Sequence, residues 1–372
     1  MAYPPYGGPV DDDRRQLMLD VLDGKPVHRV PVGFWWHYYS VPPLIRAVQD
    51  RMQGPSKVPP EVIWRILPNN PFRGYVSDRI LRTSLAGHKR DYTALKPDFV
   101  KIMSDGFFSH PSIIDNKVAS PADLHKVAHV GPDHPWIRRQ VDFVRELVDF
   151  YGGEVMTFYN VFAPVQQFRL YIEYIVKDVD GFQDLLRDHK EDVARVAEIV
   201  ADDTILLVEA LKAQTRVDGI YYSVQSAQRP ECDREHHDRF IKPSDMRVLE
   251  ASNRLWKHNI LHICGCEHYQ NDLAYYAQYP ASAYNWAVHT EGLTLAGGKN
   301  LFDGVVIGGF DNNKGSLIEV GTTDQVAEYA RSLVATAGRE RLILGADCTI
   351  PADPNLDRLN VIRYAAAEAS RQ

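Results

Sequence analysis

The segment LHICGC at residues 261–266 carries the residue types in this chain that are best suited to metal chemistry. His262 and Cys264 are two residues apart, so on a β-strand both side chains point to the same side. A further soft ligand, Cys348, follows 84 residues after Cys264 in the segment GADCTIP. One imidazole and two thiolates describe a catalytic zinc site with one open position, because thiolates favour Zn²⁺ over Mg²⁺ or Ca²⁺. The sequence therefore predicts His262, Cys264 and Cys348 as metal ligands and catalytic residues.

A zinc ion held in this way would lower the pKa of a substrate thiol in its open position and supply a thiolate nucleophile at neutral pH. Plainer interpretations stay open, because cysteine is often buried as a small apolar residue and a strand histidine can be satisfied by backbone hydrogen bonds. Cys266 lies just past the same strand, and a charged loop carries Cys232, His236 and His237. Any of these could replace one of the three predicted ligands.

Eight short apolar runs are the strands expected to position these residues. The runs are continuous rather than alternating, which is typical of parallel strands covered by helices on both faces. No G-x-G-x-x-G follows the first run and no P-loop occurs, so the α/β pattern favours an eightfold (β/α) TIM barrel over a doubly wound sheet. The predicted strands are Val30–Trp35, Phe99–Met103, Glu154–Phe158, Gly219–Val224, Asn259–Ile263, Ala281–Trp286, Val305–Gly308 and Leu342–Gly345.

Helical patterns fall between these runs. A first helix is expected to open at Asp11–Asp13, with Ser244 and Thr323 as N-caps of later helices and Gly152 and Gly338 just past helix ends. The main predicted helices are Trp136–Tyr151, Lys190–Ala213, Ser244–Lys257 and Thr323–Ala337.

The domain organisation expected from these patterns is a single barrel over residues 13–372, preceded by a loose arm at residues 1–12. An insert between the first two strands, roughly residues 40–95, is expected to cap the barrel. The aromatic arm mildly favours a homodimer.

Composition excludes several broad classes of protein. The 372 residues are 45% hydrophobic and 24% charged, which is ordinary for a globular chain and excludes disordered and coiled-coil classes. The net charge of −7 argues against nucleic acid or an anionic membrane as a partner. No apolar run is long enough for a membrane helix, and the start lacks the features of a signal peptide. With four cysteines, reduced thiols in the cytoplasm are expected.

In a barrel of this kind, chemistry gathers where the strands end. Strand-end aromatic groups suit a flat or apolar ligand, and strand-end amides suit the orientation of a small acceptor. Asp311 and Asp347 could also orient a zinc-bound histidine. The candidate substrate-binding residues are Trp36, His37, Tyr159, Tyr222, Gln225, Asn285 and Asp311.

Seven segments together carry a resemblance to a known superfamily: RVPVGFWW, PDFVKIM, IYYSVQSA, ILHICG, AYNW, VIGGFDN and LILGADCTIP, in this order. Over roughly residues 14–370 the chain resembles the uroporphyrinogen decarboxylase superfamily, which implies the same (β/α)8 barrel. True uroporphyrinogen decarboxylases carry an arginine-rich segment just after the first strand. Here that stretch reads GFWWHYYSVPPLIRA, and Arg46 is its first arginine, so the anchor for a multiply acidic tetrapyrrole is missing.

The other branch of the superfamily holds cobalamin-dependent zinc methyltransferases, such as the methylcobalamin:coenzyme M type. His262, Cys264 and Cys348 match the His-x-Cys…Cys zinc motif of that branch. The resemblance implies Zn²⁺, a small thiol substrate held as thiolate, and a methyl group delivered from methylcobalamin. The corrinoid is expected on a separate corrinoid protein, because this chain shows no D-x-H-x-x-G corrinoid motif.

Three hypotheses about function follow. The first is zinc-dependent methyl or alkyl transfer from a corrinoid to a zinc-activated thiol. The second is a divergent decarboxylase or lyase that acts on a small acid on the same barrel, with or without zinc. The third is a non-catalytic binding protein for a corrinoid, tetrapyrrole or thiol. Fold alone does not decide among them.

Overall fold

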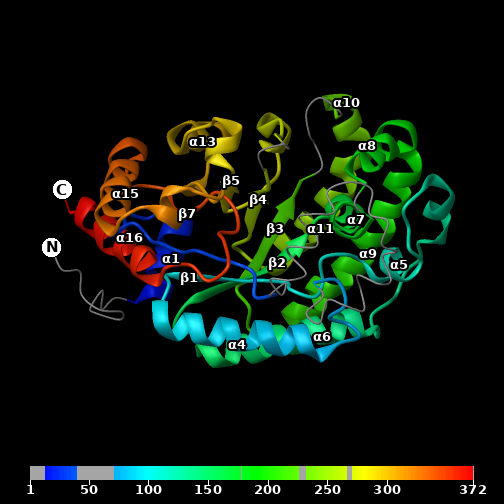
Figure 1. Ribbon diagram of the computed structural model, residues 1–372, viewed down its shortest axis with the longest axis horizontal. Helices are drawn as coiled ribbons and strands as arrows, with labels where there is room; N and C mark the ends of the chain where they lie inside the picture. The colour runs from blue at the N-terminus through cyan, green and yellow to red at the C-terminus, as the bar shows by residue number, and fades with distance from the viewer. Residues whose placement is uncertain (1–12, 40–70, 177, 226–231, 266–269, 372) are drawn as a thin grey trace.

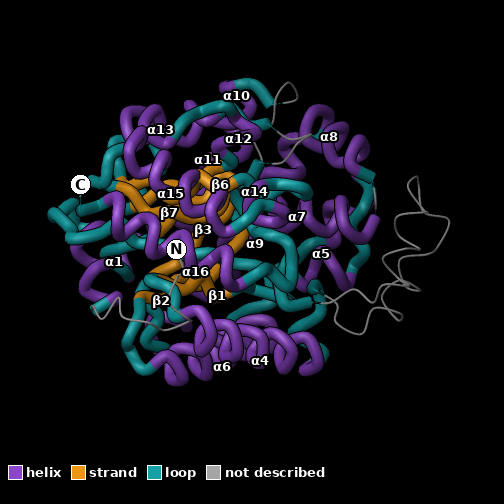
Figure 2. The backbone as a smooth tube through the Cα atoms, turned by 60° about the vertical axis from the view of Figure 1, so that its left-hand side comes forward, coloured by secondary structure: helices purple, strands orange, loops and turns teal. Residues whose placement is uncertain are grey.

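Seven parallel strands form the central sheet of the protein. The computed structural model describes residues 13–39, 71–176, 178–225, 232–265 and 270–371, and within these ranges the strands follow one another across the sheet in sequence order. Helices surround the strands on the outside (Figures 1 and 2). The strands are β1 (Phe99–Ile102), β2 (Met156–Phe162), β3 (Gly219–Val224), β4 (Ile260–Ile263), β5 (Ala283–Trp286), β6 (Val305–Phe310) and β7 (Leu342–Ala346).

The first of the eight predicted strands, Val30–Trp35, is not part of this sheet. It is an extended segment with a single parallel bridge, from Val32 to Leu344 of β7. On its other side the Asp98 N–H, just before β1, donates to the Val32 carbonyl at 3.1 Å. Val32 turns its own N–H to the Asp98 carboxylate at 2.7 Å, and Pro31 has no N–H to donate. A continuous ladder therefore does not form. The sheet curls into a half-barrel whose edge strands, β1 and β7, are linked through this segment.

The inner side of the curled sheet holds a core of its own. At least one side chain from each strand, such as Phe99, Phe158 and Ile307, packs there together with Trp35. Met18 and Val21 belong to the same cluster, and they lie on the first helix, α1 (Arg14–Leu22). The α1 helix therefore closes the end of the sheet where the strands begin. Chemistry is left to the end where the strands stop.

The outer side of the sheet packs against long helices. Along one flank α4 (Asp78–Leu95) and α6 (Pro135–Tyr151) run side by side, and on another α15 (Thr323–Ala337) packs against α16 (Leu356–Ala369) (Figure 1). The other α-helices are α5 (Pro111–Asp115), α7 (Pro164–Tyr171), α8 (Val179–Asp188), α9 (Lys190–Gln214), α10 (Arg234–His236), α11 (Lys242–Leu255), α12 (Val288–Glu291), α13 (Leu295–Phe302) and α14 (Leu317–Val320). Short 3₁₀ and π turns are η1 (Pro121–Lys126), η2 (Ile172–Val176), η3 (His237–Ile241) and η4 (Leu273–Tyr276).

The two glycines predicted just past helix ends are confirmed. Gly152 follows α6 with a φ of 63°, and Gly338 follows α15 with a φ of 72°. The predicted N-caps are wrong. The N-cap is Thr322 and not Thr323, because the Thr322 hydroxyl accepts from the Gln325 N–H. The Gln325 side chain in turn accepts from the Thr322 N–H, which completes a capping box. Ser244 lies inside α11, which the chain enters from the π turn η3 without a side-chain cap.

The predicted arm and much of the predicted insert lie outside the described residues. Cys266, an alternative ligand, also lies outside them. The later part of the insert region is not loop, because α4 occupies residues 78–95. None of the described helices combines the length and the apolarity that crossing a membrane requires.

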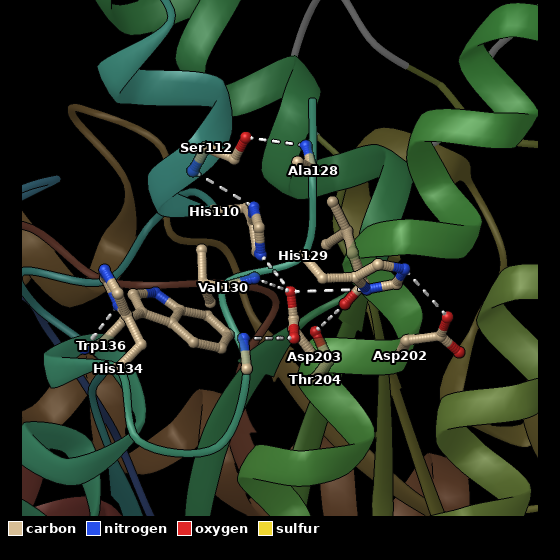
Figure 3. Close-up of polar contacts among 12 residues, drawn as sticks. His110, Ser112, Ala128, His129, Val130, His134, Trp136, Asp202, Asp203 and Thr204 are labelled. Atoms are coloured by element: carbon tan, nitrogen blue, oxygen red, sulfur yellow. Dashed lines mark hydrogen bonds and ion pairs between the residues drawn. The ribbon is translucent and has the colours of Figure 1, made fainter. Parts of the chain in front are cut away.

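A buried contact between a histidine and a carboxylate anchors the chain between β1 and α6 onto α9. His110 Nε2 lies 3.0 Å from Asp203 Oδ2, and neither side chain is more than 1% exposed. The N–H groups of Val130 and Gly131 donate to the same carboxylate at 2.8 and 3.1 Å (Figure 3). Burial raises the pKa of Asp203, but these hydrogen bonds outweigh it and bring the pKa below its ordinary value. The anchor fixes this long connection on the helical layer.

Candidate metal centre

Three predicted ligands meet at the end of the sheet where the strands stop. His262 lies on β4, Cys264 directly follows it, and Cys348 lies two residues past β7. Strands β5 and β6 separate β4 from β7, so the curl of the sheet is what brings the three together. The two Sγ atoms are 3.6 Å apart, and Cys348 Sγ is 3.4 Å from His262 Nε2. All three ligand atoms lie within 4.8 Å of one another.

These spacings fit a tetrahedral zinc ion. With Zn–S bonds of about 2.3 Å and Zn–N bonds of about 2.0 Å, two thiolates lie about 3.8 Å apart and a thiolate and an imidazole nitrogen about 3.5 Å apart. The Sγ–Sγ distance and the distance from Cys348 Sγ to His262 Nε2 differ from these values by about 0.2 Å or less. Two sulfur ligands and one nitrogen ligand leave one position open, as catalytic zinc sites do.

The backbone that carries Cys264 is held by a polar clamp. The Cys264 N–H continues the ladder to the Val224 carbonyl at 2.8 Å, and Asn271 Nδ2 donates to the Cys264 carbonyl at 2.9 Å. Glu291 in turn accepts from the Asn271 backbone and side chain. Gly265 lets this carboxylate approach, because a Cβ there would lie 2.5 Å from Glu291 Oε1. Glycine after Cys264 therefore leaves the space that the Glu291 carboxylate occupies.

A second clamp holds the residue next to Cys348. The Asp347 carboxylate accepts from the N–H and the Nδ1 of His289, both at 2.8 Å, and from the Gly309 N–H at 3.3 Å. Burial raises the pKa of Asp347, and the hydrogen bond to Asp347 raises the pKa of His289. Asp347, expected as a partner of a zinc-bound histidine, thus pairs with His289 instead of His262.

Positive charge favours a thiolate at Cys348. Its hydrogen bond with Cys264 and its proximity to His262 and Lys101 hold the pKa of Cys348 well below its usual value, against the effect of burial. Lys101 lies on β1 and is 4% exposed, and its Nζ is 4.1 Å from the centre of the Tyr221 ring. Burial lowers the pKa of Lys101 to about 8, while Cys348 and Cys264 favour its charged form.

Three predicted substrate-binding residues lie away from this centre, between the sheet and the helices. Trp36 Nε1 donates to Asp91 of α4 at 3.1 Å, and the Tyr159 hydroxyl donates to Gln140 of α6 at 2.7 Å. The Tyr222 hydroxyl donates to a carbonyl of α11 at 3.2 Å. Their partners hold all three side chains on the outer side of the sheet.

The other predicted substrate-binding residues lie nearer the strand ends. His37 Nδ1 is 2.7 Å from the buried Asp105 carboxylate, and Gln225 Oε1 accepts from Gln166 at 3.4 Å. Asp311 binds Asn313 in the turn after β6. Among these candidates Asn285 stands out, because it lies opposite His262 in the pairing of β4 with β5.

The alternative ligands do not join the centre within the described residues. Cys232 is buried in the apolar core, and burial raises its pKa to about 12. His237 is buried with its Nε2 3.2 Å from the Tyr279 hydroxyl, and burial lowers its pKa to about 4. His236 packs against Phe240. These residues belong to the helical layer around η3.

The predicted substrate-binding set leaves out three residues that line the inner side of the sheet next to His262. Trp35 and Tyr221 contact its ring, with centroids 6.5 and 5.9 Å away. Lys101 had a visible signal, since it is a lone charged residue in the apolar strand FVKIM. For Trp35 and Tyr221 the sequence gives no sign of which way the side chain faces, because each is adjacent to a second aromatic residue that faces outward.

Two solved structures were found to be similar, and the first of them supports this fold. A methyltransferase from Methanosarcina mazei is similar in structure over 95% of this chain and 98% of its own, with a TM-score of 0.63 and 15% identity. A B12-independent methionine synthase from Shewanella sp. W3-18-1, in complex with selenomethionine, is similar over 62% of this chain and 66% of its own, with a TM-score of 0.42 and 14% identity. A comparison with curated proteins gives no match.

The family follows from the sequence rather than from these structural likenesses, which at such identities concern the fold alone. Residues 108–369, well over half of the chain, match the family model described as Uroporphyrinogen decarboxylase (URO-D). With its curled parallel sheet and its surrounding helices, the chain belongs to the uroporphyrinogen decarboxylase (URO-D) family.

Proposed function

We propose that this protein is a zinc-dependent enzyme that transfers a methyl or alkyl group to a metal-activated thiol. The observation that carries the proposal is the set of one imidazole and two thiols at spacings that suit tetrahedral zinc. A bound zinc ion would lower the pKa of a thiol in its open position, so that a thiolate nucleophile exists at neutral pH. The structurally similar protein from Methanosarcina mazei is itself named a methyltransferase, which is consistent with this choice.

The residues of the chain would contribute binding and orientation. His262, Cys264 and Cys348 hold three ligand positions, and the clamps at Asn271 and Asp347 fix the backbone on both sides of the site. Such fixed geometry lowers the entropic part of the barrier, because the acceptor is held in line with the donor. The donor we propose is methylcobalamin or another corrinoid, carried by a separate corrinoid protein.

The test is the metal content of purified protein, measured for the wild type and for Cys264→Ser, Cys348→Ser and Cys232→Ser. The last variant is the matched control, since Cys232 is a buried thiol outside the centre. We expect one zinc per chain in the wild type and the control, and loss of zinc from the other two. Transfer from methylcobalamin to a panel of small thiols is then the activity assay.

A wild type that binds no zinc after incubation with Zn²⁺ would be evidence against the proposal. The match to a family named for a decarboxylase would then favour the second candidate, a decarboxylase or lyase of a small acid. Release of CO₂ from small carboxylic acids by the metal-free protein would identify that activity.

A further inference from the structure

His262 has one ring nitrogen that the candidate metal centre does not use. Its Nε2 faces Cys348 Sγ at 3.4 Å, whereas its Nδ1 is closed to solvent and has no hydrogen-bond partner. A neutral imidazole that binds a metal through Nε2 carries its proton on Nδ1. Metal-binding histidines nearly always donate that proton to an acceptor, which fixes the plane of the ring. The structure therefore has a place for an acceptor beside His262 Nδ1.

Asn285 offers an unused acceptor on the neighbouring strand. It pairs with His262 in the register of β4 and β5, so both side chains leave the sheet on the same, inner side. Its Nδ2 donates to the carbonyls of Ile307 at 2.9 Å and Ala346 at 3.1 Å. These two bonds hold the amide toward β6 and β7 and turn Oδ1 away from those carbonyls. Asn285 Oδ1 is buried and has no partner.

Two other side chains flank the ring. Ser223 pairs with His262 on the β3 side, and its hydroxyl has a partner because it donates to Asn160 Oδ1 of β2 at 3.0 Å. The Tyr221 hydroxyl is also without a partner, yet Tyr221 pairs with Ile260, one inward-facing position before His262. Of the two residues in register with His262, Asn285 is thus the one with a buried acceptor atom that has no hydrogen-bond partner.

We propose that Asn285 is a positioning residue of the metal centre. When His262 Nε2 binds the metal, Asn285 Oδ1 accepts the hydrogen bond from His262 Nδ1–H. The two atoms form no bond in this structure, so the side chains must move toward each other when the metal binds. The bond selects the tautomer with Nε2 free for the metal and holds the ring in line with the two thiols. This role rests on the proposed zinc centre.

The test compares the affinity for Zn²⁺ and Co²⁺ of the wild type, Asn285→Leu, Tyr221→Phe and Asn160→Leu, by chelator competition. Asn160→Leu is the matched control, because Asn160 is a buried inner-side amide that also has two hydrogen bonds. Loss of an acceptor for a metal-bound histidine costs about 10- to 100-fold in metal affinity. We expect that loss in Asn285→Leu alone, with an altered visible spectrum of its Co²⁺ form.

A second measurement is made on the wild type, and a variant at His262 serves only to assign the signal. Protein labelled with ¹⁵N-histidine and loaded with Zn²⁺ is expected to show a protonated, slowly exchanging Nδ1 that is missing in His262→Gln. Unchanged affinity in Asn285→Leu, a loss in Tyr221→Phe instead, an equal loss in Asn160→Leu, or a rapidly exchanging Nδ1 would each overturn the positioning role. A wild type without metal binding would overturn the zinc centre itself, and the role of Asn285 with it.

Discussion

Lys101 brings a positive charge to the inner side of the sheet, close to the predicted thiolate ligands. Its Nζ lies over the rings of Tyr221 and Trp35, at 4.1 and 5.0 Å from their centres, and no acidic side chain of the described residues pairs with it. A buried lysine without a carboxylate partner is costly unless other negative charge is near. Cys348 and Cys264 supply that charge when they are ionised, and both favour the charged form of Lys101.

Replacing this charge should weaken the thiolate. In metal-free Lys101→Met we expect the pKa of the thiol pair to rise by about one unit, because the cation that favours the thiolate is gone. The ultraviolet absorbance of thiolate, followed against pH, measures the change. Lys101→Arg keeps the charge and is the control. A titration of Lys101→Met that overlays the wild type would show that Lys101 does not act on these thiols.

At the scale of elements, α9 is tied to the long connection between β1 and α6 by Asp203. The carboxylate accepts from His110 and from two backbone N–H groups, and its pKa is lowered in the folded protein. A carboxyl group with a depressed folded-state pKa contributes stability above its unfolded-state pKa of about 4. This contribution is lost as the pH falls through the folded-state pKa. The anchor should therefore matter at neutral pH and fade in acid.

Asp203→Asn should test this anchor. At neutral pH we expect the free energy of unfolding to fall by about 1–3 kcal/mol, because buried donors lose a charged acceptor. The difference from the wild type should shrink as the pH drops below about 4. Urea unfolding across this range measures it. The control is Asp202→Asn, a half-exposed neighbour on α9, for which a change within about 0.5 kcal/mol is expected. A loss in Asp203→Asn that is the same at every pH would contradict the assignment.

At the scale of the whole molecule, the extended segment Val30–Trp35 links the two edge strands of the sheet, β1 and β7, although it forms no full strand. Arg29 forms a buried ion pair with Asp98 at 2.6 Å, and the same carboxylate accepts the Val32 N–H. The Val30 N–H donates to Ser370 Oγ next to the end of α16. Charged hydrogen bonds to Asp98 thus link the N-terminal segment to the start of β1, and a neutral hydrogen bond links it to the C-terminal helix.

Breaking this link should affect the stability of the entire fold. Arg29→Met or Asp98→Asn alone should each cost about 3–5 kcal/mol, because the remaining partner is left buried without its counter-charge. The double variant should cost less than the sum of the two, because it buries no unpaired charge. A double-mutant cycle by urea unfolding measures the coupling. Additive losses would mean that the pair does not hold the sheet edges together.

Much of this organisation could be predicted from the sequence. Gly219–Val224 and Thr323–Ala337 are predicted with the bounds that the structure has, because each is a long run with a clear period or turn signal. The helix α16 was missed, since its buried residues surround nearly its whole circumference and leave no amphipathic stripe. β2 runs on to Phe162, four residues past its predicted end, because Asn160 is satisfied inside by Ser104 and Ser223.

The sequence by itself determined seven of the eight predicted strands, and with them the pair His262 and Cys264 on one side of β4, since side chains alternate along a strand whatever surrounds it. Only the tertiary structure decided which side is the inside. Trp35 and Tyr221 face inward and Trp36 and Tyr222 outward, and no pattern in the sequence separates them. The reason is that a parallel strand buried on both faces is apolar on both, so it loses the polar alternation that would mark its orientation. The curl of the sheet, which joins Cys348 to β4, is decided at the same level.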